Sequence, residues 1–262
     1  MGSKIRIGIT KDLINKIKAA PFIFFFLDYD GTLVPIKKRP SLATLPNTTR
    51  ELLKTLSSKS WAELYIVSGR ILKDVEGLVG LKSIGYVGNH GFELKAKGLK
   101  YINNKAEASK KAIAEFYGKL KRHLNIKGLI TENKFYTLSI HYRLVKDKSL
   151  VEMLLKKIYN IAELYKGKIR LTKGKKVLEI RPNLNWNKGS MVNWILRHSR
   201  IKNVLPIFIG DDRTDEDAFR VLRKKGIGIL VSNKKRPTYA GIRLKNPQEV
   251  HKLLKETLRV KA

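Results

Sequence analysis

A run of six apolar residues, followed by the aspartates Asp28 and Asp30, constrains the fold of this chain more than any other feature. Residues 22–27 read Phe-Ile-Phe-Phe-Phe-Leu, so neither face of a strand built from them is polar. Such strands are typical of parallel sheets that are covered by helices on both sides. The run is far too short to cross a bilayer, which needs about 20 apolar residues. We therefore predict a buried strand with Asp28 at its carboxyl end.

Strand and helix patterns alternate along most of the chain. Strand patterns cover residues 22–28, 62–67, 83–87, 205–209 and 228–231, and helix patterns cover residues 1–20, 48–56, 190–199, 215–224 and 248–258. The last helix has Asn246 at a capping position, Pro247 at its first position and an acid at its third. The alternation predicts an α/β fold, a Rossmann-like parallel sheet with helices on both faces.

The middle of the chain departs from this alternation. Helix patterns at 108–121 and 149–165 are each followed by a pair of strand patterns, at 128–143 with a turn at 132–134 and at 169–181 with a turn at 173–175. Two helix-and-hairpin units predict a small α+β module inserted into the larger fold. We expect a core of residues 1–106 and 183–262, and a cap of residues 107–182 that acts as a substrate lid.

The charge balance raises the question of a polyanionic partner. The chain has 55 Lys and Arg against 22 Asp and Glu, a formal net charge of +33. Such a charge attracts nucleic acid or an anionic membrane surface, but it also fits a solvated basic surface, because no long block of basic residues stands out. We expect no dedicated nucleic-acid site, although non-specific polyanion binding fits the charge. The chain has no Cys, which excludes disulfides and thiolate metal sites. With no secretory signal or membrane span recognised, we expect a cytoplasmic protein whose oligomeric state the sequence does not indicate.

Polar residues follow the predicted strands where open parallel sheets place their binding sites, beyond the carboxyl ends. Asp28 and Asp30 are two residues apart and so project to the same side. Carboxylates this close repel each other, and a bound cation or a shared proton relieves that repulsion, although Asp-Gly is also a common turn dipeptide. Ser68, Gly69 and Arg70 follow the next strand, where a hydroxyl and free helix N–H groups form either an anion site or an ordinary helix cap.

The third polar segment, Gly-Asp-Asp-Arg-Thr-Asp-Glu-Asp, is rich in acids in a chain that is otherwise short of them. Hard oxygen ligands of this kind suit Mg²⁺. Asp211 is the candidate ligand, and Asp212 and Asp215 are candidates for contacting the metal ligands rather than the ion itself. Part of the segment has a structural alternative, because Thr214 and Asp217 have the spacing of a capping box for the next helix.

Lys188 lies where the next helix is predicted to begin. A cation at that position opposes the helix dipole, which favours acids at helix N-termini. Its position is explained if it faces a phosphate and the carboxylate of Asp28, whereas the alternative is one of many surface lysines.

These segments, in this order and on these elements, resemble the haloacid dehalogenase superfamily of phosphatases. The resemblance implies that Asp28 attacks phosphorus and becomes an aspartyl-phosphate. It implies that Asp30 is the general acid and base, protonating the leaving sugar oxygen and then activating water. Ser68 and Lys188 would hold the phosphoryl oxygens. Mg²⁺ would be held by Asp28, the main-chain carbonyl of Asp30 and Asp211.

Three further motifs are similar to those of trehalose-6-phosphate phosphatases: Gly-Asn-His-Gly from Gly88, Ser-Ile-His-Tyr-Arg from Ser139 and Glu-Ile-Arg-Pro from Glu179. The acid-rich segment and the two helix-and-hairpin units are similar too. The resemblance implies substrate contacts from Gly69, Arg70, Asn89, His90, His141, Arg143, Glu179 and Arg181. Structural alternatives are a cross-strand ion pair for Glu179 and Arg181, a packed strand histidine at His141 and a turn for the Asn-His pair.

Two other functions fit the same sequence. A phosphatase for sucrose phosphate, mannosyl-phosphoglycerate or a glucosyl phosphate would keep the Asp28 chemistry and differ only in its cap contacts. A basic protein that binds polyanions on this scaffold would explain the net charge, which is not expected of the family, but would leave the phosphatase motifs without a role. The sequence therefore predicts a Mg²⁺-dependent phosphatase that acts on a small sugar phosphate, with trehalose 6-phosphate as the favoured substrate.

Overall fold

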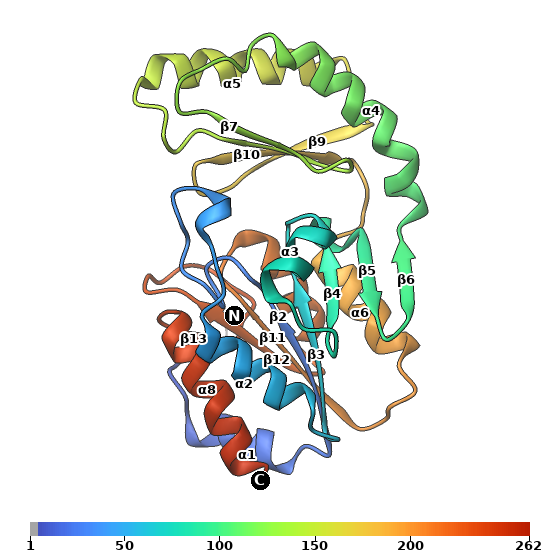
Figure 1. The fold of residues 1–262 in the computed structure, drawn as a ribbon, viewed down its shortest axis with the longest axis vertical. Coiled ribbons are helices and arrows are strands. Elements are labelled where there is room, and N and C mark those ends of the chain that lie inside the picture. Colours follow the sequence, from blue (N-terminus) through green and yellow to red (C-terminus); the bar gives the residue numbers. More distant parts are fainter. Residues whose placement is uncertain (1–4) are drawn as a thin grey trace. The chain divides into compact units, whose positions relative to one another are not determined.

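The computed structural model describes residues 5–262, which divide into two compact units (Figure 1). Unit 1 comprises Met1–Tyr101 and Trp186–Ala262, and unit 2 comprises Ile102–Asn185. The strands of unit 1 are β1 (Arg6–Ile7), β2 (Phe22–Leu27), β3 (Ala62–Val67), β4 (Gly85–Gly88), β5 (Glu93–Ala96), β6 (Leu99–Ile102), β11 (Val204–Gly210), β12 (Ile227–Val231) and β13 (Ile242–Leu244). Its helices are α1 (Lys11–Ala19), α2 (Asn47–Ser57), α3 (Leu72–Val79), α6 (Lys188–His198), α7 (Glu216–Leu222) and α8 (Pro247–Val260), with short 3₁₀ turns η1 (Pro40–Leu42), η2 (Asn89–Gly91) and η3 (Arg213–Asp215).

Unit 1 is built on a nine-stranded sheet in the order β1-β13-β12-β11-β2-β3-β4-β5-β6. The strands from β1 to β4 in this order are parallel to their neighbours, and β5 turns back antiparallel to β4. The mixed α/β fold with a mainly parallel sheet confirms the predicted fold class. The parallel strands bring the carboxyl ends of β2, β3 and β11 to one edge of the sheet, where their polar segments follow.

The apolar strand β2 lies at the centre of the sheet and is buried on both faces. Ile23, Phe25 and Leu27 belong to the core that packs under α1, α2, α3 and α8. Phe24 and Phe26 belong to the opposite core, which packs under α6 and α7. The two cores account for the absence of polar residues from this run, because each side chain in it faces a helical layer.

The N-terminal segment differs from the predicted helix at 1–20. Residues 1–4 lie outside the described part of the chain, and β1 then pairs with β13, with Arg6 opposite Ile242. Gly8 has a positive φ of 79°, and the helix begins only at Lys11, where the side chain of Thr10 caps it. The amphipathic pattern therefore predicted the helix but not the strand before it, which exists only through its pairing with a distant edge.

Unit 2 is an antiparallel sheet covered on one face by two helices. Its elements are α4 (Asn104–Lys121), β7 (Ile130–Asn133), β8 (Leu138–His141), α5 (Lys148–Glu163), β9 (Ile169–Lys173) and β10 (Val177–Pro182), and the strand order is β7-β8-β10-β9. Leu138, Ile140, Leu178 and Ile180 pack against the helices. The predicted turn at 132–134 is misplaced, since the first hairpin turns within residues 134–137.

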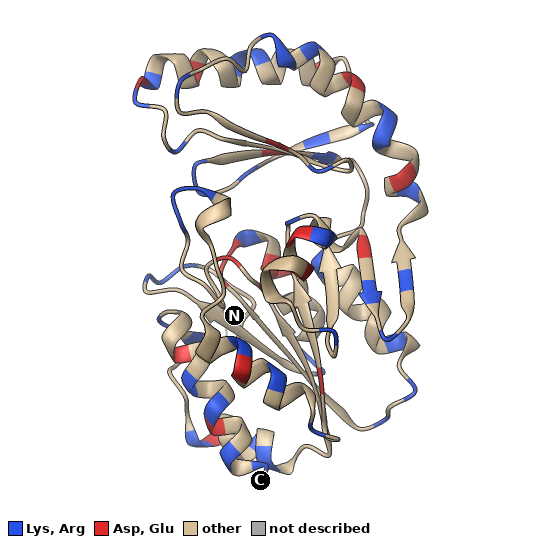
Figure 2. Cartoon of the chain, in the orientation of Figure 1, with Lys and Arg blue, Asp and Glu red and all other residues tan. Residues whose placement is uncertain are grey.

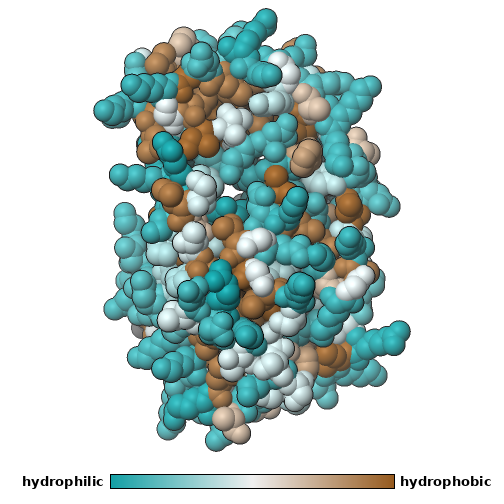
Figure 3. All heavy atoms as spheres, in the orientation of Figure 1, coloured by the Kyte–Doolittle hydropathy of each residue, from teal (hydrophilic) through white to brown (hydrophobic). Residues whose placement is uncertain are grey.

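The surface of both units is basic and largely hydrophilic. Figure 2 shows Lys and Arg spread over the helices and loops of both units rather than gathered on one element. Figure 3 shows apolar side chains gathered over the helical layer of unit 2, where Met153 on α5 is 62% exposed. No helix among residues 5–262 is long and apolar enough to cross a membrane.

Candidate active site

Asp28 is buried where β2 ends, and a lysine from a distant helix holds its carboxylate. The main-chain N–H of Asp28 donates to the Ile209 carbonyl on β11 (2.9 Å). Lys188 Nζ donates to Asp28 Oδ1 and to Asp215 Oδ1, each at 2.7 Å. Lys188 is the first residue of α6, which Asn187 caps, and its side chain is only 3% exposed. A buried positive charge at a helix N-terminus is unfavourable, and the two carboxylates compensate for it at Lys188.

Three carboxylates form one buried cluster at this edge of the sheet. Asp28, Asp211 and Asp215 each offer an oxygen atom, and these atoms lie within 4.8 Å of one another. Lys188 brings one positive charge to the three carboxylates. A donor set of close carboxylate oxygens fits a hard divalent cation, which would balance the remaining negative charge.

Two glycines make room for this cluster. At Gly31, which has a φ of +89°, a Cβ would overlap the carboxylate of Asp211. At Gly210 a Cβ would overlap the carboxyl group of Asp215. The glycines that accompany the aspartates in both motifs are therefore required by the close packing of the carboxylates against the main chain.

The close packing of charges in the cluster shifts the pKa values of Asp28 and Lys188. Burial raises the pKa of Asp28 well above its ordinary value, and the charges of Asp215 and Asp211 add to this effect against the attraction of Lys188. Burial by itself would lower the pKa of Lys188, but the nearby Asp215 and Asp28 carboxylates outweigh it and raise that pKa. Lys188 therefore stays protonated, and a cation among the carboxylates would favour the ionised form of Asp28.

Asp30 lies outside the carboxylate cluster. Arg70 holds it in a bidentate contact, Nε to Oδ2 at 2.6 Å and Nη2 to Oδ1 at 2.7 Å. Arg70 also donates to the Pro40 carbonyl (2.9 Å) and lies 5.4 Å from the centre of the Tyr29 ring. The Asp30 side chain is 39% exposed, so it is both held in place and accessible.

The loops after β3 and β4 bring Ser68, Gly69, Asn89 and His90 together. Ser68 is buried, and its hydroxyl accepts the main-chain N–H of Arg70 (3.1 Å). The main-chain N–H of His90 donates to the Ser68 carbonyl (3.0 Å), and a Cβ on Gly69 would overlap the His90 ring. Asn89 Nδ2 donates to a carboxylate on β5, Glu93 Oε2 (2.5 Å). Sequence analysis did not single out that carboxylate, because β5 was not predicted.

The acid-rich segment folds differently from the predicted capping box. Thr214 and Asp217 do not form one: α7 begins at Glu216, and the buried Asp215 instead accepts the main-chain N–H of Asp212 (2.8 Å). Asp215 therefore binds Lys188 through one carboxylate oxygen and stabilises the turn through the other. Arg236, which sequence analysis did not identify, donates to the Asp212 carbonyl (3.1 Å).

Unit 2 carries its candidate residues on the sheet face opposite the helices. Glu132, Ser139 and Glu179 lie in one register row across β7, β8 and β10. His141 Nε2 lies 2.7 Å from Glu132 Oε2, and the Ser139 hydroxyl donates to Glu179 Oε1 (3.2 Å). Lys134 Nζ is 3.7 Å from Glu132 Oε2 and 4.0 Å from Glu179 Oε1. We call these five side chains the polar row, a set of hydrogen-bonding groups suited to hydroxyl-rich ligands.

The two remaining candidates of unit 2 are Arg143 and Arg181. Arg143 follows the end of β8 and donates to the Lys175 carbonyl in the β9–β10 turn (2.8 Å). Arg181 lies further along β10, opposite Arg170 on β9, and is only 4% exposed. Sequence analysis grouped these arginines with His141 and Glu179 as substrate contacts, and that grouping stays a prediction.

The chain matches known proteins along most of its length. A sequence model of the trehalose-phosphatase family matches residues 26–248. Trehalose-phosphate phosphatase B of Arabidopsis thaliana is 35% identical, with 93% of this chain and 68% of that protein covered. Probable trehalose-phosphate phosphatase 3 of Oryza sativa subsp. japonica is 38% identical, with 91% and 70% covered.

A solved structure agrees with these matches. The C-terminal domain of the trehalose-6-phosphate phosphatase of C. albicans superposes with a TM-score of 0.82 at 25% identity, covering 98% of this chain and all of that domain. The family match, the relatives and the fold confirm the resemblance inferred from the motifs. The chain therefore belongs to the trehalose-phosphatase family, whose members are phosphatases with the haloacid dehalogenase fold.

Proposed function

We propose that this protein hydrolyses trehalose 6-phosphate to trehalose and phosphate, with Asp28 as the nucleophile and Mg²⁺ as the cofactor. The names of its relatives support the substrate. The geometry supports the chemistry, and one observation carries it: the Asp28 carboxylate is buried at the strand end, fixed by Lys188, inside a cluster of acids. A fixed carboxylate beside a cation is what nucleophilic attack on a phosphate ester requires.

In the first step, an oxygen of the Asp28 carboxylate attacks phosphorus and the bond from phosphorus to the sugar oxygen breaks. Asp30 gives its proton to that oxygen, so that trehalose leaves neutral and Asp28 carries the phosphoryl group. Lys188 donates to Asp28, and the Ser68 hydroxyl accepts the main-chain N–H of Arg70, whose side chain holds Asp30. We assign Lys188 and Ser68 to the phosphoryl oxygens. Lys188 remains protonated for this role, since its carboxylate neighbours raise its pKa.

In the second step, Asp30 takes a proton from water, and the resulting hydroxide attacks phosphorus. The bond between phosphorus and the Asp28 oxygen breaks, which releases phosphate and restores the carboxylate. Asp30 is held by two hydrogen bonds from Arg70 in this structure. Because those bonds occupy both carboxylate oxygens of Asp30, at least one of them must loosen before Asp30 can give a proton to the substrate or take one from water.

The metal role rests on the donor set of unit 1. Asp28, Asp211 and the main-chain carbonyl of Asp30 would hold Mg²⁺, and Asp215 would fix Lys188 from the other side of the cluster. Bound there, the ion would neutralise charge between the phosphate and the nucleophile.

We also propose that residues 107–182 serve as the substrate lid. His141, Glu179 and Arg181 would contact the sugar hydroxyls, Arg143 would contribute at the periphery, and Gly69, Arg70, Asn89 and His90 would bind on the core side. A disaccharide offers many hydroxyl groups, which suits the donors and acceptors of the polar row. A cytoplasmic location is part of the same proposal.

The test is phosphate release by the purified protein with Mg²⁺, from trehalose 6-phosphate, sucrose 6-phosphate, glucose 6-phosphate and an aryl phosphate, with Asp28→Asn as the blank. We expect a strong preference for trehalose 6-phosphate that the variant abolishes. Preference for another sugar phosphate would reject the substrate and retain the chemistry. No Asp28-dependent release from any ester would reject the phosphatase.

A further inference from the structure

A second pocket of unit 1, outside the carboxylate cluster, is lined by basic residues. It has a volume of about 360 Å³ and is lined by Ile5, Lys235, Arg236, Pro237 and Arg243. Arg243 lies on β13 between Ile242 and Leu244, which both belong to the core under α1 and α8. Because side chains alternate along a strand, Arg243 projects to the opposite face. The loop after β12, which supplies Lys235, Arg236 and Pro237, also lines the pocket.

Arg243 is a buried cation whose charge the structure does not balance. Arg243 is only 9% exposed, and its Nε and Nη1 atoms are buried with no hydrogen-bond partner among residues 5–262. A buried donor without a partner is unfavourable, and more so when the group is charged. Buried guanidinium groups in proteins are normally paired with carboxylates or phosphates.

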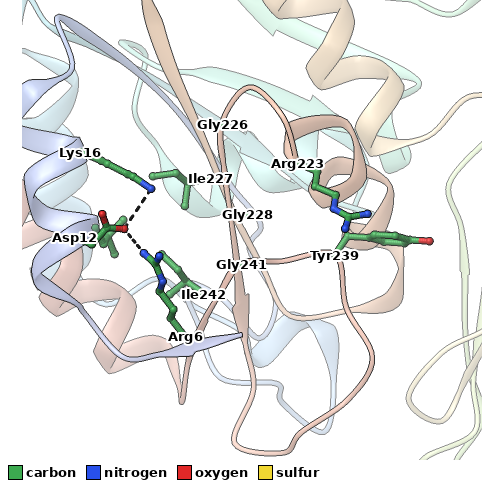
Figure 4. A pocket seen from close by; sticks show the side chains of 11 residues that line it. Arg6, Asp12, Lys16, Arg223, Gly226, Ile227, Gly228, Tyr239, Gly241 and Ile242 are labelled. Atoms are coloured by element: carbon green, nitrogen blue, oxygen red, sulfur yellow. Dashed lines mark hydrogen bonds and ion pairs between the residues drawn. The ribbon is translucent and has the colours of Figure 1, made fainter. Parts of the chain in front are cut away.

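A neighbouring pocket shows the usual arrangement. It is lined in part by Arg6, Asp12, Lys16 and Arg223, as Figure 4 shows. Both Arg6 and Lys16 form ion pairs with Asp12, so each of these cations already has an acid of the chain as its partner. Among the residues that the structure describes, no acid lines the Arg243 pocket.

One wall of the Arg243 pocket is already fixed. Arg236 Nη1 is ion-paired with Glu216 Oε1 (2.7 Å), and Arg236 Nη2 donates to the Asp212 carbonyl (3.1 Å). The positive charge of Arg236 is thus matched by an acid of the chain. Lys235 is exposed, so Arg243 and Lys235 are the cations that the described lining of the pocket offers to a ligand. Because this wall is already ordered, less conformational entropy is lost when a ligand binds.

We propose that this pocket binds a small soluble anion that carries a phosphate or carboxylate group, with Arg243 and Lys235 as its cationic partners. The planar guanidinium of Arg243 matches either group in a bidentate contact. The pocket has the volume for an anion larger than inorganic phosphate, such as a phosphorylated or carboxylated metabolite.

Thermal unfolding at constant ionic strength tests the proposal. Wild type and Arg243→Met are compared in sodium chloride, in sodium phosphate and in sodium citrate. A ligand that binds only the folded state at 100 times its Kd raises the Tm of a protein of this size by roughly 5 °C or more. We expect a rise in phosphate, citrate or both that is several degrees larger in wild type than in Arg243→Met. The anion that gives the larger difference identifies the phosphate or the carboxylate class.

Phosphate bound at the active site would raise the Tm of both proteins equally, so the difference between them reports this pocket alone. Arg6→Gln removes a cation that is already paired and should keep the full rise. If Arg243→Met does not fold, Lys235→Gln replaces it and should show a reduced rise. Equal rises in wild type and in the pocket variant with both anions would overturn the proposal.

Discussion

The carboxylate cluster of unit 1 and the polar row of unit 2 differ in how far their charged side chains are buried. Asp28, Asp211 and Asp215 are at most 5% exposed, and Lys188 ties two of them together. In the polar row, Ser139 and Lys134 are buried, but the side chains of Glu132 and His141 remain 30% and 26% exposed. Buried charges hold one geometry because any other leaves them unpaired, whereas exposed groups exchange partners with water at little cost. We propose that the cluster carries out the reaction and that the polar row selects the substrate.

Asp28→Asn should have the largest effect and should not depend on the ester. Without a nucleophilic carboxylate, kcat should fall by at least about 10⁴-fold for trehalose 6-phosphate and for an aryl phosphate alike. Phosphate release is the measurement. Asp217→Asn, in the same acid-rich segment but outside the cluster, is the matched control and should stay within about twofold. A variant that retained activity on either ester would remove Asp28 from the mechanism.

Lys188→Met should reduce the stability of unit 1. The change leaves two buried carboxylates without their cation, which costs about 3–5 kcal/mol when one partner of a buried pair is removed. Urea unfolding without divalent metal measures the loss. Lys225→Met is the control, because Lys225 is exposed and its Nζ donates to the neutral side chain of Asn193, so its effect should stay below about 0.5 kcal/mol. Equal losses in the two variants would show that the cluster does not depend on Lys188.

Glu179→Gln should separate the two regions. If the polar row binds the sugar, kcat/KM for trehalose 6-phosphate should fall about 10- to 100-fold while that for an aryl phosphate stays unchanged, because only the disaccharide uses the contact. Steady-state rates on both esters measure the split. Equal losses on the two esters would reject a sugar-binding role for Glu179.

Arg143→Gln should have the smallest effect. Arg143 is exposed and donates to a main-chain carbonyl outside the polar row, so its loss should lower kcat/KM for trehalose 6-phosphate by only about threefold. Rates on the same two esters provide the measurement. A loss as large as that of Glu179→Gln would place Arg143 among the main substrate contacts.

The elements that could be predicted from sequence are those with strong local patterns. β3 begins and ends where its apolar run does, and Asn246 and Pro247 start α8 as predicted. β5, β6 and β13 were not predicted, because each is a run of only three or four residues that a Lys or Arg interrupts. β1 has two residues, and only its pairing with β13 makes it a strand.

The candidate site shows the same division. The spacing of Asp28 and Asp30 and the acid-rich segment located the site, because those residues are close in the chain. The bidentate contact between Arg70 and Asp30 joins residues 40 positions apart, and no local pattern predicts it. The entry of Asp215 into the cluster depends on the 3₁₀ turn η3, which turns its carboxylate inward toward Lys188.

The most direct test of the central claim is to trap the covalent intermediate. The protein is quenched in acid during turnover of trehalose 6-phosphate with Mg²⁺, and its peptides are analysed by mass spectrometry for a phosphorylated aspartate. The account predicts a phosphoryl group on Asp28 that is absent in Asp28→Asn. A phosphoryl group on a different residue in the wild-type protein, formed during turnover, would contradict it.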